Sequence, residues 1–257
     1  MSETAGYRGE TAGQLLRTWR QRRRLSQLDL ANRADVSSRH LSYVENGRSR
    51  PSSTMILRLC DHLQVPPREQ NAILLAGGHA PTLPEHALTD PSLAQANLAI
   101  EQILTAHDRW PALVLDRGWE LVAANDATYR FLEGVDPALL EPPVNVIRLS
   151  LDPRGLAPRI VNLDQWRDHL LARVAREYEV SADPRLGELL AEFGRARDPS
   201  GTGVDLVIPL RLRVGDDIWS FIATTTVFGT PHEVTLSELA IETFYPADDA
   251  TRALATP

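Results

Sequence analysis

The hydrophobic and polar positions of residues 26–47 predict two short helices joined by a tight turn. Leu28 and Ala31 share one face of the first helix, and Leu41 and Val44, three residues apart, mark the buried face of the second. Polar and aromatic side chains occupy the opposite face of the second helix. This pattern is typical of a helix-turn-helix, in which the second helix is presented for recognition.

Capping and turn residues agree with these two helices. Ser26 is placed to cap the first helix, and Ser37 or Ser38 to cap the second. Asp35 falls where the chain has to turn sharply, a position that often requires a positive φ, and Asp adopts such angles more readily than most residues. Gly47 ends the second helix.

Three further helical patterns surround this motif and predict an all-α domain of five short helices. One begins at Thr11, a second follows Pro51, and a third follows Pro66 and stops at Gly77–Gly78. Cys60 is the only cysteine and falls within an apolar helical pattern, which favours a buried thiol.

The second half of the chain combines strands with helices. Residues 111–125 predict two strands around a turn at Asp116–Gly118. With three later strands they predict a five-stranded antiparallel sheet with helices on one face, and residues 145–151 are apolar enough to run alongside the core. The remaining expected elements are helices at about 92–107, 126–132, 163–181 and 184–197, and strands at about 204–214, 218–229 and 233–245.

Residues 79–91 contain three prolines and little periodicity, which predicts a linker. We therefore expect a helix-turn-helix domain at residues 1–78 and a second domain at residues 92–250. Charge is divided between them, because residues 1–78 hold 12 arginines against seven acidic residues and the remainder holds 15 against 27. A basic first domain on an acidic second one indicates that only the first meets a polyanion.

Other function classes find no support in the sequence. It contains no Gly-x-Ser-x-Gly elbow, phosphate loop, dinucleotide fingerprint or His-Glu-x-x-His motif, so we predict no enzyme. One cysteine and seven scattered histidines predict no metal site, and we expect no cofactor. No stretch of about 18 apolar residues and no apolar signal region occurs, so we expect the protein to stay in the cytosol.

Residues 25–51 read Leu-Ser-Gln-x-x-Leu-Ala, a turn, Val-Ser, then Leu-Ser-Tyr-Val-Glu-Asn-Gly-Arg-x-x-Pro. This resembles the Xre/Cro-C1 class of DNA-binding domain over residues 11–77, with Asp35 where that class often has Gly. The resemblance implies a protein that binds double-stranded DNA, and useful specificity then favours a homodimer on an inverted repeat.

The start of the second helix is the part expected in the major groove. Arg39 is the best candidate for reading a base, because a guanidinium matches two acceptors of guanine, with phosphate contact as the alternative. The arginines of residues 17–24 are candidates for further phosphate contacts. The residues expected at DNA are Gln27, Ser37, Ser38, Arg39, His40, Tyr43, Asn46, Arg48 and Arg50.

The second half also resembles a known family. The markers are residues 110–116 (Trp-Pro-Ala-Leu-Val-Leu-Asp), residues 119–125, and the closing Leu-Ala-Ile-Glu-Thr-Phe-Tyr-Pro-Ala at 239–247. Over about 92–250 they resemble the MmyB-like ligand-binding domain found behind Xre-type heads. The resemblance implies a transcriptional regulator with a PAS-like pocket that holds a small apolar molecule, including fatty acids.

Two hypotheses remain open for this domain. In the favoured one it senses a ligand, and Arg148 or Arg213 is a candidate for meeting a ligand carboxylate, with surface ion pairs as the alternative. In the other it is a ligand-free domain for dimerisation or partner binding. The expected cavity residues, each of which ordinary core packing also explains, are Tyr129, Phe131, Trp166, Leu170, Trp219, Phe221 and Phe244.

Overall fold

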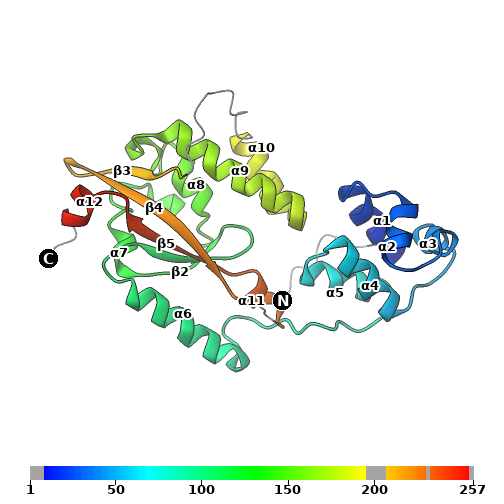
Figure 1. The fold of residues 1–257 in the computed structure, drawn as a ribbon. Coiled ribbons are helices and arrows are strands. Elements are labelled where there is room, and N and C mark those ends of the chain that lie inside the picture. The colour runs from blue at the N-terminus through cyan, green and yellow to red at the C-terminus, as the bar shows by residue number, and fades with distance from the viewer. Residues whose placement is uncertain (1–8, 195–206, 230–231, 255–257) are drawn as a thin grey trace. The chain divides into compact units, whose positions relative to one another are not determined.

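The computed structural model describes residues 9–194, 207–229 and 232–254, shown as a ribbon in Figure 1. The chain forms two compact units, which we call the head and the body. The head contains the described residues up to Glu85, and the body most of those that follow. The expected arrangement of elements is confirmed, since the head has five helices with a helix-turn-helix and the body has five antiparallel strands with packed helices.

Side-chain caps set where the helices of the head begin. Thr11 and Ser26 each form a capping box with the third residue of the helix that follows. Ser37 and Ser52 each accept a hydrogen bond from the backbone N–H three residues on. The head helices are α1 Ala12–Arg22, α2 Gln27–Arg33, α3 Ser38–Glu45, α4 Ser53–Leu63 and α5 Pro67–Ala76.

The turn between α2 and α3 has the expected backbone. Asp35 has a φ of 50°, and Gly47, with a φ of 71°, follows α3. Leu28, three residues before Ala31, is 59% exposed, while Leu30 and Ala31 face the core. With seven residues, α2 makes barely two turns and buries only those two side chains.

Close packing of α1 against its neighbours forms the core of the head. Leu15, Leu16 and Trp19 are at most 2% exposed. Gly13 allows α3 to approach, since a Cβ atom there would lie 2.0 Å from the carbonyl oxygen of Val44. Cys60 is fully buried, as expected, and burial raises the pKa of its thiol to about 12.

The five strands of the body form one antiparallel sheet in the order β2-β1-β5-β4-β3. β5 lies in the centre, so Glu242 is paired with Leu113 of β1 on one side and with Thr225 of β4 on the other. The strands are β1 Ala112–Leu115, β2 Leu121–Ala124, β3 Leu210–Val214, β4 Asp217–Val227 and β5 Ala240–Pro246.

Helices cover both faces of this sheet, so the expectation of helices on one face is wrong. All four residues of β1 are buried, and Leu113 and Leu115 point into the main core while Ala112 and Val114 join a second cluster. Helix α6, Ala94–Ala106, completes that second cluster through Ile100 and Leu104. The main core lies on the other face, where α9 contributes Trp166, Leu170, Leu171 and Val174.

Residues 146–151 form α8, a helix that runs alongside the core, as expected for this apolar segment. One expected segment of the body differs from the structure. Residues 234–237 form α11 and do not begin a strand, because the N–H groups of Glu238 and Leu239 bond the carbonyls of Thr235 and Leu236 and are unavailable to the sheet. The other helices are α7 Asp126–Tyr129, α8 Val146–Leu151, α9 Leu163–Ser181, α10 Pro184–Phe193, α11 Val234–Ser237 and α12 Asp249–Leu254, with 3-10 turns at Pro91–Leu93, Pro137–Leu139 and Ala157–Arg159.

The strand expected from residue 204 is described only from residue 207, and its ladder begins at Leu210. The expected helix end at 195–197, the first residues of that strand at 204–206, and positions 230–231 of the expected turn lie outside the described residues.

Candidate DNA-binding surface and ligand cavity

The first turn of α3 presents a continuous polar surface. Ser37 caps the helix and accepts a hydrogen bond from the backbone N–H of His40 at 3.1 Å. Ser37, Ser38, Arg39 and His40 are all exposed, and Tyr43, one turn later, is half-buried. These five residues from the sequence prediction therefore lie together on one accessible surface.

Arg39 and Tyr43 form a pair on that surface. The guanidinium of Arg39 donates from Nε to the Tyr43 hydroxyl at 3.0 Å and lies 5.5 Å from the centroid of its ring. The contact restrains a long side chain and leaves the two terminal nitrogens of the guanidinium for other acceptors. Such a restrained fork is suited to bidentate recognition of a base edge.

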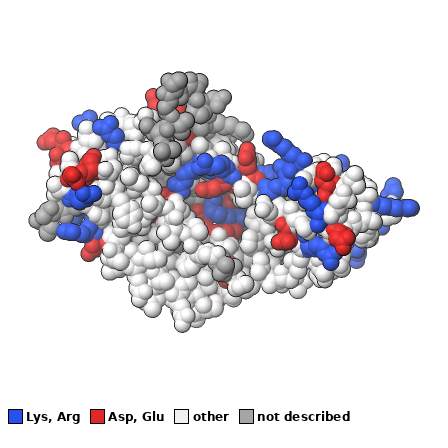
Figure 2. Space-filling model, viewed as in Figure 1, with Lys and Arg blue, Asp and Glu red and all other residues white. Residues whose placement is uncertain are grey.

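The other residues expected at DNA flank this pair. Gln27, half-buried at the start of α2, donates from Nε2 to Glu45 Oε2 at 2.8 Å. Asn46 is exposed and donates to the Ser42 carbonyl at 2.8 Å. Arg48 and Arg50 are exposed in the loop after α3. In the view of Figure 2, arginine side chains project from several parts of the head surface.

Arg20 is excluded from the expected phosphate contacts, because its side chain is committed to the interior. Its Nε and Nη2 donate to the two carboxylate oxygens of Glu45, each at 2.7 Å, and Nη1 donates to the Leu25 carbonyl. The hydrogen bond with Glu45 raises the pKa of Arg20. The ion pair joins the end of α1 to the end of α3, so its role is to hold the two helices together.

An apolar cavity of about 70 Å³ lies in the body between the sheet and its helices. Leu113 and Leu115 reach it from β1, and Ile147 and Leu149 reach it from α8. Its wall is aliphatic and aromatic, apart from Thr128, Ser150 and Glu242.

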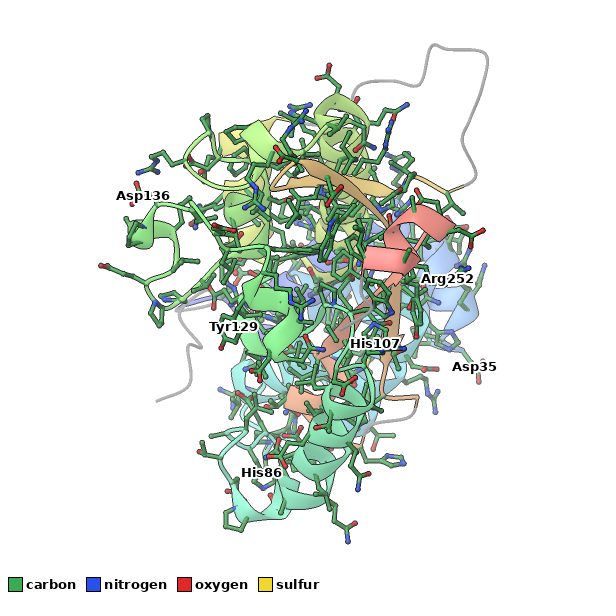
Figure 3. The ribbon with its side chains drawn as sticks, turned by 90° about the vertical axis from the view of Figure 1, so that its left-hand side faces the viewer. Asp35, His86, His107, Tyr129, Asp136 and Arg252 are labelled. Carbon is green, nitrogen blue, oxygen red and sulfur yellow. The ribbon has the colours of Figure 1, made fainter. Side chains whose placement is uncertain are left out.

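The structure divides the expected ligand-binding residues into three groups. Phe131, Trp166, Leu170 and Phe244 line the cavity. Trp219 and Phe221 belong to the same core but do not line the cavity. Tyr129 is 62% exposed on α7, where Figure 3 labels it, and cannot contact a molecule in the cavity.

Several cavity residues were not anticipated from the sequence. Leu113 and Leu115 were detectable, because alternating residues of a strand share a face. Trp119 and Glu242 also line the cavity. The only sequence signal for Glu242 is its acidic side chain in the centre of an apolar strand, between Ile241 and Thr243.

A polar cluster borders the cavity beside α9. Arg173 donates to both carboxylate oxygens of Glu242, and Thr225 donates its hydroxyl to Glu242 Oε1 at 2.8 Å. The guanidinium of Arg173 lies 4.7 Å from the centroid of the Trp119 ring, and the Trp119 indole N–H donates to Glu177 at 2.6 Å.

Burial is the largest effect on the pKa values of Glu177 and His169 in and beside this cluster. It raises the pKa of Glu177, against the opposing effects of the Trp119 hydrogen bond and the Arg173 charge. It also lowers the pKa of His169, and the positive charge of Arg173 adds to that effect.

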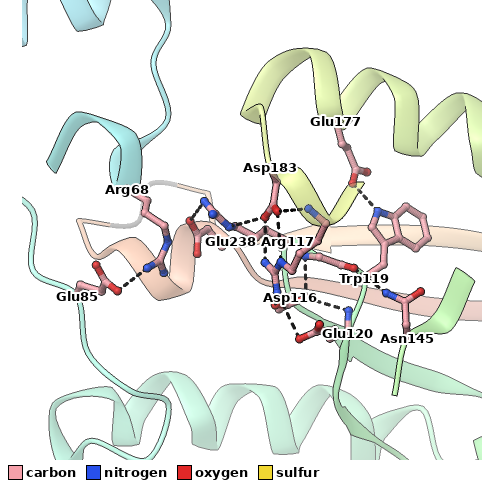
Figure 4. A network of polar contacts seen from close by, with 12 residues as sticks. Arg68, Glu85, Asp116, Arg117, Trp119, Glu120, Asn145, Glu177, Asp183 and Glu238 are labelled. Atoms are coloured by element: carbon pink, nitrogen blue, oxygen red, sulfur yellow. Dashed lines mark hydrogen bonds and ion pairs between the residues drawn. The ribbon is translucent and has the colours of Figure 1, made fainter. Parts of the chain in front are cut away.

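A second network of charges supports the β1–β2 turn (Figure 4). Asp183, at the start of α10, forms ion pairs with Arg117 at 2.8 Å and Arg185 at 3.0 Å. Arg185 also bonds Asp116, which accepts the backbone N–H of Gly118. Burial alone raises the pKa of Asp183, but the hydrogen bond from Arg185 and the charges of both arginines outweigh it and lower the pKa. The network fixes the turn that carries Trp119.

The two arginines considered for a ligand carboxylate do not line the cavity. Arg148 forms an ion pair with Glu192 at 2.8 Å, with both side chains more than 40% exposed. Arg213 is exposed, because it alternates with buried Leu212 on β3. Both arginines therefore lie on the surface, and neither is placed to meet a ligand carboxylate in the cavity.

The described residues contain neither a metal-binding group nor a helix able to span a membrane. Among residues 9–194, 207–229 and 232–254, no group of three His, Cys, Asp or Glu side chains is placed to hold a metal ion. No helix in the described part of the chain has the length and hydropathy needed to cross a bilayer.

Comparisons with known proteins agree with this architecture. Residues 96–256 match the family model of the MmyB-like transcription regulator ligand binding domain, and residues 11–73 match a helix-turn-helix domain. No curated protein matches the chain. A solved structure described as an RNA-binding Light-Oxygen-Voltage receptor is 15% identical with a TM-score of 0.30, which is too low to carry an argument. That match covers 98% of this chain and 63% of the other.

Because the ligand-binding family model spans more than half of the chain behind a helix-turn-helix domain, the protein belongs to the family of transcription regulators with an MmyB-like ligand-binding domain.

Proposed function

We propose that this regulator reads a specific DNA sequence through α3 and that a small apolar ligand in the body cavity controls this binding. The observation that carries the proposal is the apolar cavity of about 70 Å³ in a chain that also carries an exposed helix-turn-helix surface. The proposed division is a DNA-binding domain at residues 1–78, a linker at 79–91 and a ligand-binding domain at 92–250.

The proposed role of Arg39 is to read a base. Its side chain is exposed and restrained by Tyr43, which lowers the entropy lost when the guanidinium binds two acceptors of guanine. We assign Ser38, His40 and Tyr43 to the same groove, and Gln27, Ser37, Asn46, Arg48 and Arg50 to the phosphates. One head covers few base pairs, so we propose a homodimer on an inverted repeat.

The size and chemistry of the cavity limit the range of ligands that it can hold. A cavity of about 70 Å³ is smaller than the roughly 300–1,000 Å³ of sites for drug-sized ligands. It is also about half the size of a cavity of ~150 Å³ that binds benzene. We therefore propose a small apolar molecule, or one end of a longer alkyl chain such as that of a fatty acid.

DNA binding with and without ligand tests the proposal. Operator duplexes are selected from a random library with the purified protein, and their affinity is then measured by fluorescence anisotropy as short-chain alcohols and fatty acids are added. We expect apolar compounds to change the affinity in wild type but not in Leu170→Trp, in which a larger side chain fills the cavity. An operator affinity that no apolar compound changes, together with no small molecule in the mass spectrum of denatured protein, would contradict the proposal.

The alternative is that the body serves only for dimerisation, and one observation favours it. The exposed residues of α6 include Ala94, Leu98 and Gln102, and Leu98 is 55% exposed. The surface over α6 in Figure 2 is almost entirely white. Glu101 is the one charged residue among the exposed positions of α6, and a surface with so few charges suits association between two copies.

Light scattering separates the two hypotheses. If the body only dimerises, Leu98→Asp yields a monomer with weak operator binding, and Leu170→Trp has no effect on any ligand response. If the body senses a ligand, the Leu170→Trp variant loses the response while its oligomeric state stays that of wild type.

A further inference from the structure

The polar part of the cavity wall is not neutral. Three of the residues that line the cavity are polar. Thr128 donates to the Ala112 carbonyl at 3.1 Å, and Ser150 accepts the Trp166 indole N–H at 3.1 Å. Glu242 is the charged one, and its side chain is 5% exposed. A ligand in this cavity therefore meets a buried carboxylate.

Glu242 retains capacity to accept a hydrogen bond. Its Oε1 accepts from Arg173 Nη2 and from the Thr225 hydroxyl. Among the described residues, Oε2 accepts only from Arg173 Nη1, at a longer 3.3 Å. A carboxylate offers about four acceptor positions, so Oε2 has room for a donor supplied by a ligand.

The cavity lacks the complementary charge for an anion. None of the lining residues in the described part of the chain is basic. The guanidinium of Arg173 is already engaged, since it is bonded to Glu242 and Thr225 and stacked on Trp119. An entering carboxylate would lose its water and find no unengaged cation in the cavity wall, and this desolvation cost is large where the dielectric constant is low.

We propose that Glu242 makes the cavity selective for neutral apolar molecules that carry a hydrogen-bond donor, such as an alcohol, over carboxylates of the same size. A hydroxyl that donates to Glu242 Oε2 forms a charge-assisted bond, which is stronger than a bond between neutral groups. A fatty acid can place its alkyl chain in the cavity only when its carboxylate stays outside. The inference rests on the proposed ligand-sensing function and names the chemical class that the site takes.

Binding of three probes of equal length to the full chain tests this selectivity. 1-Pentanol, pentanamide and pentanoate are titrated at pH 7.5, and the indole N–H resonances of Trp119 and Trp166, which both line the cavity, are followed by NMR. We expect 1-pentanol and pentanamide to bind at least about tenfold more tightly than pentanoate, which corresponds to about 1.4 kcal/mol. This comparison uses wild type, so it does not depend on the folding of any variant.

Glu242→Gln then tests the cause, because the amide keeps the shape of the side chain and removes its charge. We expect the preference for 1-pentanol over pentanoate to fall below about threefold in this variant. The matched control is Glu192→Gln, which removes an exposed carboxylate and should leave the preference unchanged. A preference that survives Glu242→Gln in a folded variant overturns the role of Glu242.

The outcomes separate the inference from the proposed function. If none of the three probes shifts either resonance, the proposed small-ligand function fails. If pentanoate binds as tightly as 1-pentanol, the function stands and the selectivity is wrong.

Discussion

The head and the body each bury an Arg–Glu ion pair, and the two pairs have different surroundings. In the head, Arg20 and Glu45 meet in a filled interior, where the side chain of Glu45 is fully buried. In the body, Arg173 and Glu242 meet at the wall of a cavity. The same chemistry therefore holds helices together in one unit and gives an apolar cavity a polar position in the other.

The hydrogen bonds of the two pairs explain the difference. Glu45 accepts from Arg20 twice and from Gln27, so both of its oxygens have short bonds. Glu242 has one oxygen with short bonds and one with a single bond of 3.3 Å. A filled polar network stabilises a fold, whereas a network with spare capacity beside a cavity can recognise a ligand.

The largest expected effect comes from breaking the pair in the head. Glu45→Ala leaves Arg20 buried without its partner, and we expect a loss of about 3–5 kcal/mol in the free energy of unfolding of the head. Hydrogen exchange of the amides of α1 and α3, read by mass spectrometry, measures this loss. The control is Asp61→Ala, which truncates an exposed acidic residue of α4 and should change the value by less than about 0.5 kcal/mol.

The corresponding truncation in the body should cost less. Water can enter the cavity beside Arg173 when the side chain of Glu242 is removed, so we expect Glu242→Ala to cost about 1–3 kcal/mol. Exchange of the amides of β4 and β5 measures it. If Glu242→Ala destabilises the body as strongly as Glu45→Ala destabilises the head, the contrast between the two pairs is wrong.

The third prediction concerns the exposed surface of the head. Arg39→Ala should weaken binding to the selected operator by about 1–3 kcal/mol and relax the preference at one base pair. Arg48→Ala is the matched control, since loss of a phosphate contact should weaken binding to specific and random duplexes alike. Equal losses on both duplexes for Arg39→Ala would show that Arg39 contacts only phosphate.

A smaller effect is expected at the turn before α3. Asp35 has a φ of 50°, an angle that glycine adopts without strain, so Asp35→Gly should stabilise the head by a few tenths to about 1 kcal/mol. Asn32→Gly, at an exposed position within α2, should destabilise it by about 0.3 kcal/mol, the difference between the helix propensities of Asn and Gly. Chemical denaturation followed through Trp19 fluorescence compares the two variants.

The smallest expected effect is a change in pH dependence. Because burial raises the pKa of Glu177 above its usual value of 4.5, the unfolded chain releases this proton first as pH rises, and the body loses stability from about pH 4.5 upward. Glu177→Gln keeps an acceptor for Trp119 and removes the titration. The variant should therefore gain stability relative to wild type between pH 4 and pH 7, and a constant difference over that range would contradict the pKa shift.

Most of the head could be predicted from its sequence. Ser26, Ser37, Asp35 and Gly47 act on neighbours within four residues, so their roles can be assigned from spacing alone. The buried position of Arg20 could not be predicted, because its partner Glu45 lies 25 residues away in the sequence. Nothing in the spacing distinguishes Arg20 from the four other arginines of residues 17–24. The exposure of Leu28 could not be predicted either, since a helix of seven residues has too little periodicity to define its buried face.

The body was less predictable. The number of strands and the long helix at 163–181 followed from periodicity and β preference, whereas Tyr129, Trp219 and Phe221 were assigned to a cavity that they do not line. An aromatic residue in an apolar pattern is expected to be buried, but the pattern does not say whether it borders empty space or packed neighbours.

By itself, the sequence determined the two units, the helix-turn-helix with its exposed polar surface, and the make-up of the sheet, because caps, turns and periodicity are properties of nearby residues. Only the tertiary structure decided that α6 covers the second face of the sheet, that a cavity remains in the main core, and that Glu242 borders it. The physical reason is that these features depend on register and packing between segments far apart in the chain, such as Glu242 with Leu113 and Arg173.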